Sequence, residues 1–196
     1  MTITDTTTHA PSGHTALLPV ALDLYRDIHK AIRAELFCVT ATAGRTDPGD
    51  AVARADLARH ITSVVDLLDQ HAEHEDAAIQ VLIERHLPDA AETIAGDHAA
   101  FEHAAARLGA MSVEAVDAGA DHRWLLHCLY VDLAAFTGRY LAHQDLEERV
   151  VMPGLEAAVG PEAVLDVHRQ IVGGMPPEEL MRGLALMIPA MNVDDR

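Results

Sequence analysis

Histidine is the residue type through which this sequence could do chemistry, because 13 histidines occur among its 196 residues. Histidine is the commonest metal-ligating side chain, and ordinary protein cores use it sparingly. Three of the histidines are followed four residues later by a glutamate, in the pairs His71 with Glu75, His98 with Glu102 and His143 with Glu147. On a helix this spacing stacks both side chains on one face, where they could bind the same metal ion.

The apolar pattern around these residues indicates which way they point. In a helical bundle the inward positions recur at alternating steps of three and four residues. Four segments show this pattern, and each carries a histidine on its inward stripe. Glu102 follows His98 by four residues and is therefore a further candidate. The four stripes are Leu22, Tyr25, His29, Ile32 and Leu36; Leu57, Ile61, Val64, Leu68, His71, Glu75, Ala78 and Leu82; Ile94, His98, Phe101, Ala105 and Leu108; and Leu126, Leu129, Leu133, Phe136, Tyr140, His143, Glu147 and Val150.

Burying these imidazoles and carboxylates without partners would cost on the order of several kcal/mol for each charge. The stripes contain no Lys or Arg that could act as a counter-ion. Metal cations would supply the missing charge, and four histidines with two or three glutamates match a site for two metal ions. We expect Glu75 and Glu147, from different helices, to bridge the two ions. The alternative is a buried hydrogen-bond network of His and Glu without metal.

Two tyrosines and the remaining histidines have less certain roles. Tyr25 and Tyr140 each precede a striped histidine by one step, so they could ligate, donate hydrogen bonds or transfer electrons, or simply pack in the core. His168 lies on an apolar face and is expected to be packed there. Six further histidines lie beside or opposite the stripes and are expected at the surface: His60, His74, His86, His103, His122 and His127.

The elements that position these residues are predicted to be helices almost throughout. Aromatic residues make up only 4% of the chain, and Ala, Leu, Glu, Asp and Arg favour helix over sheet. Gly and Pro mark the ends of four long helices, predicted at 19–43, 50–86, 89–116 and 121–152. The last helix either ends at Pro153 or continues, kinked, to Gly160. Two shorter helices are predicted at 161–173 and 177–191.

The predicted fold class is all-α, an up-down-up-down four-helix bundle with two shorter C-terminal helices, because short connections favour antiparallel neighbours. Residues 1–16 are rich in Thr and lack an apolar period, so we interpret them as a disordered leader. The bundle is assigned to residues 17–160, and residues 161–196 are expected to pack on it.

The charge and the apolar content exclude several function classes. Thirty-one acidic residues against 14 basic ones give a formal charge of −17, which would repel nucleic acid and anionic lipid. No apolar run approaches the ~18 residues needed to span a bilayer, and no secretory signal is visible, so we expect a cytoplasmic protein. Cys38 and Cys128 stand in apolar helical patterns and are interpreted as buried, reduced thiols.

The order and spacing of the striped residues resemble those of the hemerythrin-like, or HHE cation-binding, family. The motifs are a lone His29, then His71-Ala-Glu-His-Glu75, then His98, then His143-Gln-Asp-Leu-Glu147. The stretch from Glu147 to Pro153 also looks like the end of the fourth helix in that family. The resemblance covers about residues 17–160.

This resemblance implies a non-heme centre of two iron ions bridged by the carboxylates of Glu75 and Glu147. It implies that one iron is held by His29 and His71, and that the other is held by His98 and His143. The sequence departs from the oxygen-carrying hemerythrins at Glu102, where they have a second third-helix histidine, and at its last ligand, where they have an aspartate. It is closer to bacterial hemerythrin-like proteins and to the iron-sensing domain of a ubiquitin-ligase subunit.

Three functions remain open from the sequence. The first is a diiron protein that binds or reacts with a small oxidant, a diatomic ligand such as O2 or nitric oxide, or peroxide. The second is an iron or oxygen sensor without turnover, although no motif for a protein partner is visible. The third is a diiron oxidase of a small organic substrate, covered by the C-terminal helices with Gly173 and Gly174 as a hinge. A pocket beside the metals would favour the third.

Overall fold

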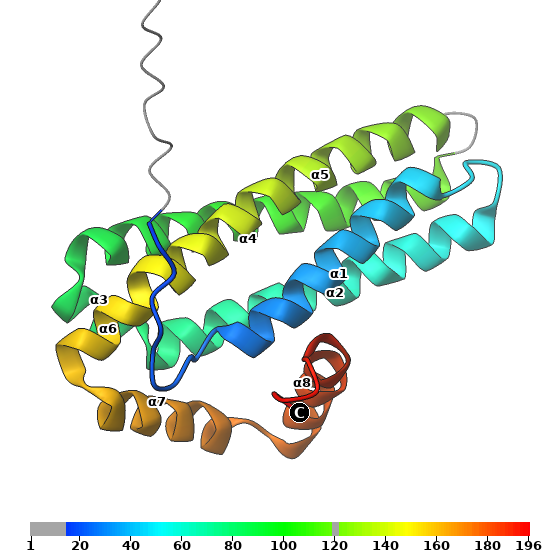
Figure 1. The fold of residues 1–196 in the computed structure, drawn as a ribbon. Helices are drawn as coiled ribbons and strands as arrows, with labels where there is room; N and C mark the ends of the chain where they lie inside the picture. Colours follow the sequence, from blue (N-terminus) through cyan, green and yellow to red (C-terminus); the bar gives the residue numbers. More distant parts are fainter. Residues whose placement is uncertain (1–14, 119–121) are drawn as a thin grey trace, which may run out of the picture.

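Four long helices form the body of the protein in a computed structural model that describes residues 15–118 and 122–196. They are α1 (Arg26–Arg45), α2 (Ala51–Ala78), α4 (Pro88–Asp117) and α5 (His122–Leu146). Helices α1 and α4 each contact both α2 and α5, so the four pack as a bundle (Figure 1). All regular elements within the described ranges are helical, which confirms the prediction of an all-α fold. None of these helices is long and apolar enough to cross a membrane.

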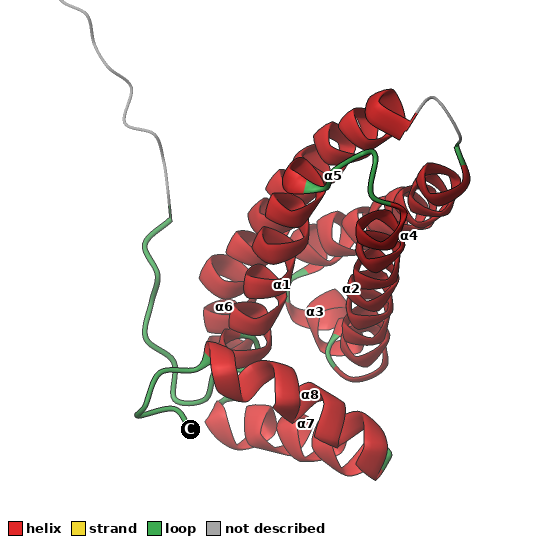
Figure 2. Cartoon of the chain, turned by 90° about the vertical axis from the view of Figure 1, so that its right-hand side faces the viewer, coloured by secondary structure: helices red, strands yellow, loops and turns green. Residues whose placement is uncertain are grey.

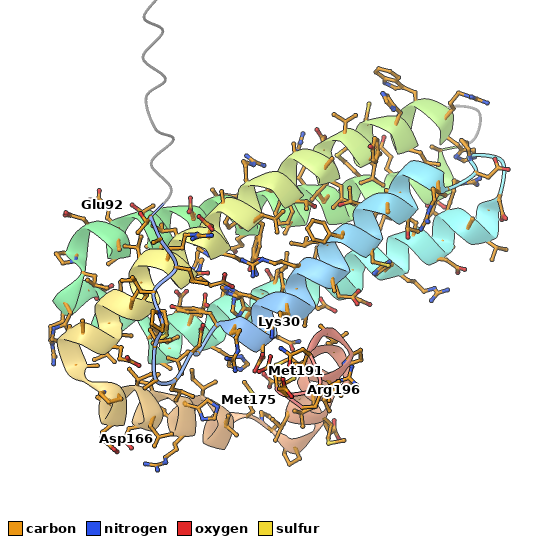
Figure 3. All side chains as sticks on the ribbon, in the orientation of Figure 1. Lys30, Glu92, Asp166, Met175, Met191 and Arg196 are labelled. Atoms are coloured by element: carbon orange, nitrogen blue, oxygen red, sulfur yellow. The ribbon has the colours of Figure 1, made fainter. Side chains whose placement is uncertain are left out.

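Five shorter elements lie toward one end of the bundle (Figure 2). They are α3 (Gln80–His86), the π-helical turn η2 (Glu147–Val151), α6 (Met152–Val159), α7 (Pro161–Gly174) and α8 (Pro177–Ala190). Helix α7 contacts α6 and α2, and α8 contacts α1. Lys30 of α1 binds Asp195 at 2.6 Å, which holds the C-terminal segment on α1 (Figure 3). Of the predicted leader, residues 1–14 lie outside the described residues, as do residues 119–121 between α4 and α5.

The first helix begins at Arg26, so the prediction of a start at residue 19 was wrong. The Asp23 carboxylate accepts hydrogen bonds from the backbone N–H groups of Tyr25 and Arg26, both at 3.0 Å, and so caps the helix there. Before this cap, the backbone N–H of Ala21 donates to Glu156 of α6 at 2.8 Å. The preceding segment is thus bound to another helix and does not form a turn of α1.

The second predicted helix is divided at Ile79 into α2 and α3. This division shifts the inward positions by one residue. Ile79 and Ile83 are buried, whereas the predicted positions Ala78 and Leu82 are only half-buried. The predicted stripe was therefore wrong beyond Glu75, because it assumed one uninterrupted helix.

The fourth predicted helix continues past Pro153 as α6, but it widens first into η2. The N–H of Met152 donates to the carbonyl of Glu147, five residues back. A π-helical turn inserts one extra residue, and it often accompanies a functional site. Because of that extra residue Val151 is fully buried and Val150 is 37% exposed, the reverse of the prediction. Of the two alternatives at Pro153, the continued helix is correct.

The apolar core consists of two clusters with the striped histidines between them. One cluster fills the bundle from Ile32 and Leu68 toward the α1–α2 connection. The other contains Tyr25 and Ile79 and extends to α6 and α7. His29 lies between Tyr25 and Ile32 in sequence and is fully buried, so the polar residues occupy the junction of the clusters.

The prediction of two buried thiols was wrong. Cys38 is exposed and Cys128 is half-buried. Leu36 and Val39 take the inward positions beside Cys38, and Leu129 does so beside Cys128. An apolar neighbourhood in the sequence therefore did not place the thiols on the inward face.

Candidate metal centre

Six of the seven candidate ligands come together in the core of the bundle and form two overlapping groups. Within each group the ligand atoms all lie within 4.8 Å of one another. The residues are nearly inaccessible to solvent, and the most exposed histidine side chain, that of His98, retains 11% of its surface. The first group is His29, His71, Glu75 and Glu147, and the second is Glu75, His98, His143 and Glu147.

Glu75 of α2 directs its two carboxylate oxygens to different groups. Its Oε1 lies 3.1 Å from Nε2 of His71, one turn earlier on the same helix. Its Oε2 lies 3.3 Å from Nε2 of His98 on α4. The carboxylate thus lies between the two positions that a pair of cations would take.

Glu147, the first residue of η2, also directs its two carboxylate oxygens to different groups. Its Oε1 lies 3.2 Å from Nε2 of His143, and its Oε2 lies 3.4 Å from Nε2 of His29. All four imidazoles therefore present Nε2 to the centre. The two carboxylates are shared between the groups in the way that bridging ligands are shared between two metal ions.

Most of these converging atoms make no hydrogen bond within the part of the chain that the structure describes. They include Nε2 of three histidines, both oxygens of Glu75 and Oε2 of Glu147. Buried polar atoms without partners cost about 1–3 kcal/mol each, and native proteins avoid them except where an ion or a function accounts for them. Imidazole nitrogen and carboxylate oxygen are ligands for iron, manganese and zinc. The residues present therefore fit a metal centre.

Three of the four histidines are each oriented by a different carboxylate outside the centre, which lies within hydrogen-bonding distance of Nδ1. A hydrogen bond from Nδ1–H leaves the Nε2 lone pair free for a metal, and it makes the imidazole a stronger ligand. The pairs are His29 with Glu148 at 3.0 Å, His98 with Asp76 at 3.0 Å and His143 with Asp97 at 3.2 Å.

Sequence reasoning missed these three carboxylates, although a signal was present. Glu148 follows Glu147, Asp76 follows Glu75, and Asp97 precedes His98. A residue adjacent to an inward ligand points about 100° away around the helix axis, toward the neighbouring helix. Adjacency to a ligand was therefore the sign that each acid reaches a histidine of another helix.

Glu148 also binds α1 through Arg33. The guanidinium donates from Nη1 to Oε1 at 2.7 Å and from Nη2 to Oε2 at 3.1 Å. Burial alone would raise the pKa of Glu148, but the hydrogen bonds from His29 and Arg33 outweigh it and lower the pKa to about 2. Glu148 is thus ionised at neutral pH and holds the His29 ring in place.

The electrostatics of the centre favour a cation. Burial, and next the charge of Glu147, raises the pKa of Glu75 well above its ordinary value. Burial, and next the charge of His29, lowers the pKa of His71, which keeps this imidazole neutral. A neutral His71 imidazole beside a Glu75 carboxyl group that resists ionisation without a counter-charge is a state in which a cation would be favoured.

The two striped tyrosines pack against two of the candidate ligand histidines. The ring centroids are 5.1 Å apart for Tyr25 and His29, and 5.6 Å apart for Tyr140 and His143. Burial, then the charges of Glu75 and Glu147, raises the pKa of both phenols. Both phenols therefore keep their protons.

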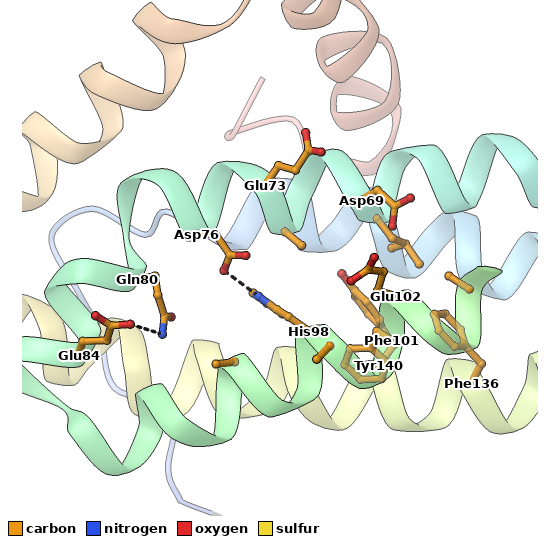
Figure 4. Close-up of a pocket in the computed structure, with 15 residues that line it drawn as sticks. Asp69, Glu73, Asp76, Gln80, Glu84, His98, Phe101, Glu102, Phe136 and Tyr140 are labelled. Atoms are coloured by element: carbon orange, nitrogen blue, oxygen red, sulfur yellow. Dashed lines mark hydrogen bonds and ion pairs between the residues drawn. The ribbon is translucent and has the colours of Figure 1, made fainter. Parts of the chain in front are cut away.

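Glu102 is not among the converging residues. It is exposed and belongs to neither group of ligand atoms. It lines an acidic groove of about 570 Å³ between α2 and α4, together with Asp69, Glu73 and Asp76 (Figure 4). His98 also lines this groove, so the second group of ligands is the one that approaches it.

The remaining histidines lie away from the ligand atoms or bind acids of their own. His60 is 3.0 Å from Glu35, and His74 is 2.8 Å from Glu179 of α8. His168 of α7 is exposed, so the expectation that it is packed on an apolar face was wrong.

Comparison with known proteins gave one match. The family model of the hemerythrin HHE cation-binding domain matches residues 20–155, a range that contains all six converging ligands. No curated protein and no solved structure matches the chain. The match ends before α7 and α8 begin.

Proposed function

This chain belongs to the hemerythrin HHE cation-binding family, and we propose that it is a non-heme diiron protein that binds or reacts with a small oxidant such as O2, peroxide or nitric oxide. In this proposal neighbouring long helices run antiparallel, in an up-down-up-down order. Their ligand-bearing turns then lie at the same height along the bundle axis. The proposed ligands are His29 and His71 for one iron, His98 and His143 for the other, and Glu75 and Glu147 as bridges.

The observation that carries the proposal is the sharing of both glutamates. Each offers one oxygen to the first group of histidines and the other oxygen to the second. A single ion would leave two imidazoles and half of the carboxylate oxygens without partners in the core. Two ions account for all of them.

The donor set favours iron over zinc in a structural site. Structural zinc sites are closed, four-coordinate and usually contain cysteine, whereas no cysteine belongs to either group here. Two carboxylates with four neutral imidazoles offset only half of the charge of two divalent ions. When bound, the irons would supply redox chemistry and coordination positions open to a small ligand.

The surrounding residues would select for small ligands. The centre is buried between two apolar clusters, and its least buried histidine, His98, lies on the acidic groove. Glu102, which stands where oxygen carriers have a second histidine, is exposed and leaves one fewer protein ligand on the His98 side. Tyr140 lines the same groove and can donate a hydrogen bond there. We infer that a small oxidant binds or reacts on the His98 side of the centre, and we favour this function over reversible carriage of O2.

The proposal is tested by metal content and by an optical spectrum. The chain is loaded with iron(II) without oxygen, desalted, analysed for iron and zinc, and then exposed to O2, peroxide and nitric oxide in separate samples. We expect two irons per chain and a visible charge-transfer absorption that changes on exposure. Consumption of peroxide distinguishes reaction from sensing without turnover. A chain that retains one zinc and no iron would contradict the proposal.

A further inference from the structure

A cavity of about 170 Å³ lies between the bundle and the two C-terminal helices. Residues of α1, of α2 and of the segment just before α1 form its inner wall, and residues of α7 and α8 form its outer wall. Figure 2 shows α7 and α8 next to the bundle. The family match ends at residue 155, before either outer helix begins. The cavity is therefore completed by a part of the chain that the family domain does not include.

The wall of this cavity is mainly apolar. Burying apolar surface against it would be favourable by about 25 cal/mol per Å². A charged ligand would lose its hydration there without gaining partners along most of the wall. The principal apolar residues are Leu24, Ile28 and Leu67 on the inner wall, and Ile171, Leu180 and Met187 on the outer wall.

The inner end of the cavity reaches the metal centre. Tyr25, His71 and Glu75 line it, and the last two are candidate metal ligands. Only the first ligand group contributes a histidine to this cavity, whereas His98 of the second group lines the acidic groove between α2 and α4. The two sides of the centre thus face spaces of different chemistry, one apolar and one acidic.

Gly183, in the middle of α8, keeps part of this space open. Glycine inside a helix costs about 0.5–1 kcal/mol relative to alanine. A Cβ atom added at this position would meet only the methyl group of Met187, at 3.9 Å. Because Gly183 lies on the cavity wall, a larger side chain there would occupy the cavity.

Polar contacts hold the outer helices in place over the cavity. His74 of α2 and Glu179 of α8, both on the cavity wall, lie 2.8 Å apart. Asp195, beyond α8, binds Lys30 at 2.6 Å and lies 3.5 Å from Arg26. The cavity is thus bounded by helices that are bound to the bundle at two places.

We propose that this cavity is a binding site for a small, uncharged, apolar organic molecule, about the size of one six-membered ring, held beside the metal-binding residues. An apolar protein cavity of about 150 Å³ is large enough to bind benzene. The inference goes beyond the proposed oxidant chemistry, because the walls need no metal to hold such a molecule. It also favours the organic-substrate alternative that the sequence left open.

Toluene is the probe for this proposal. Its binding to the full-length, iron-loaded chain is measured by titration calorimetry and by ligand-observed NMR, and one saturable site is expected. Gly183→Leu should weaken binding roughly tenfold or more, because the added side chain fills the space. Ala185→Leu is the matched control, since Ala185 is an exposed residue of the same helix outside the cavity wall. It should leave the affinity unchanged.

A second variant makes the test independent of one substitution in α8. Ile171→Trp fills the same cavity from α7 and should weaken toluene binding in the same way. Absence of toluene binding, or equal binding by Ala185→Leu and both filled variants, would overturn the proposal. Iron content is measured in parallel. A chain with two irons and no toluene site refutes the cavity proposal alone, whereas a chain with a toluene site and no iron refutes only the diiron function.

Discussion

Single residues around the centre differ in how they would affect a bound metal. The imidazole of His143 donates from Nδ1 toward Asp97, whose carboxylate lies 3.2 Å away. Loss of such an outer carboxylate typically lowers metal affinity by 10- to 100-fold, because the imidazole becomes a weaker and less well oriented ligand. The outer carboxylates are therefore the residues through which affinity can be changed without removing a ligand.

Asp97→Asn should weaken iron(II) binding by roughly tenfold, since the amide keeps the size of the side chain and removes its charge. Affinity is measured by competition with a chelator of known strength. Glu92→Gln is the control, because Glu92 is an exposed acid of the same helix (Figure 3). Equal loss of affinity in both variants would show that the net charge of α4 matters and the His143 contact does not.

Substitutions at Glu75 and Glu102 should have opposite outcomes. Glu75→Ala removes an oxygen from each of the two ligand groups, so iron content should fall from two ions per chain to one or none. Glu102→Ala should leave iron content and spectrum unchanged, because Glu102 is exposed and belongs to neither group. Iron analysis of both variants after desalting checks this. Loss of iron from Glu102→Ala would contradict this prediction and would mean that Glu102 contributes to iron binding.

At the scale of helices, Glu148 connects α1 to η2. Its pKa is lowered to about 2 from an ordinary value of 4.5. A carboxyl group with a lowered folded-state pKa stabilises the fold above its unfolded pKa, and this contribution is lost as the pH falls from about 4.5 to about 2. The contacts with His29 and Arg33 are therefore expected to stabilise the fold only above this range.

Glu148→Gln should lower the free energy of unfolding by about 1 kcal/mol at pH 7, a figure that allows for screening by solvent. The difference from the unmodified chain should shrink below pH 4.5 and disappear near pH 2. Urea unfolding at a series of pH values, with chelator present in both samples, measures it. A difference that is constant with pH would mean that Glu148 acts through packing and not through its charge.

Two glycines at different helical positions should respond oppositely to the same substitution. Gly160, between α6 and α7, has φ +83°, a region that disfavours side chains, so Gly160→Ala should destabilise the fold by about 1 kcal/mol or more. Gly109 lies inside α4, where an added Cβ meets nothing within 4 Å. Gly109→Ala should stabilise by about 0.5–1 kcal/mol. Thermal unfolding midpoints of the two variants give the sign of each effect.

At the scale of the whole molecule, the candidate metal centre joins α1, α2, α4 and α5 through one set of converging His and Glu side chains. Removing the metals with a chelator should lower the unfolding midpoint by roughly 5–10 °C, because ligand binding stabilises the folded state by about 2–4 kcal/mol at moderate excess. The loss should grow as the pH rises, since the raised pKa of Glu75 means that its ionisation without a cation destabilises the fold. Scanning calorimetry with and without chelator measures both effects. An unchanged midpoint would indicate that the carboxylates do not need a cation.

The sequence by itself determined that the fold is all-α, and it named the six residues that converge, together with Glu102, which does not. The 3.6-residue period of a helix places His71 and Glu75 on one face whatever the helix packs against. The same holds for His143 and Glu147. Because this relation is local, an apolar stripe shows that the residues on it point inward for as long as the helix continues without a break or an extra residue. The convergence of four such stripes then followed from the need to bury them together.

Tertiary structure decided what depends on neighbouring helices. Glu102 follows a histidine by four residues, as Glu75 and Glu147 do, but the packing of α4 leaves it exposed. The break at Ile79 and the π-helical turn at Glu147 each moved the buried positions by one residue, which a regular period cannot predict. The outer carboxylates and the apolar cavity arise between helices far apart in the sequence. Their existence depends on helix rotation and separation, which are set by side-chain packing and not by the period of any one helix.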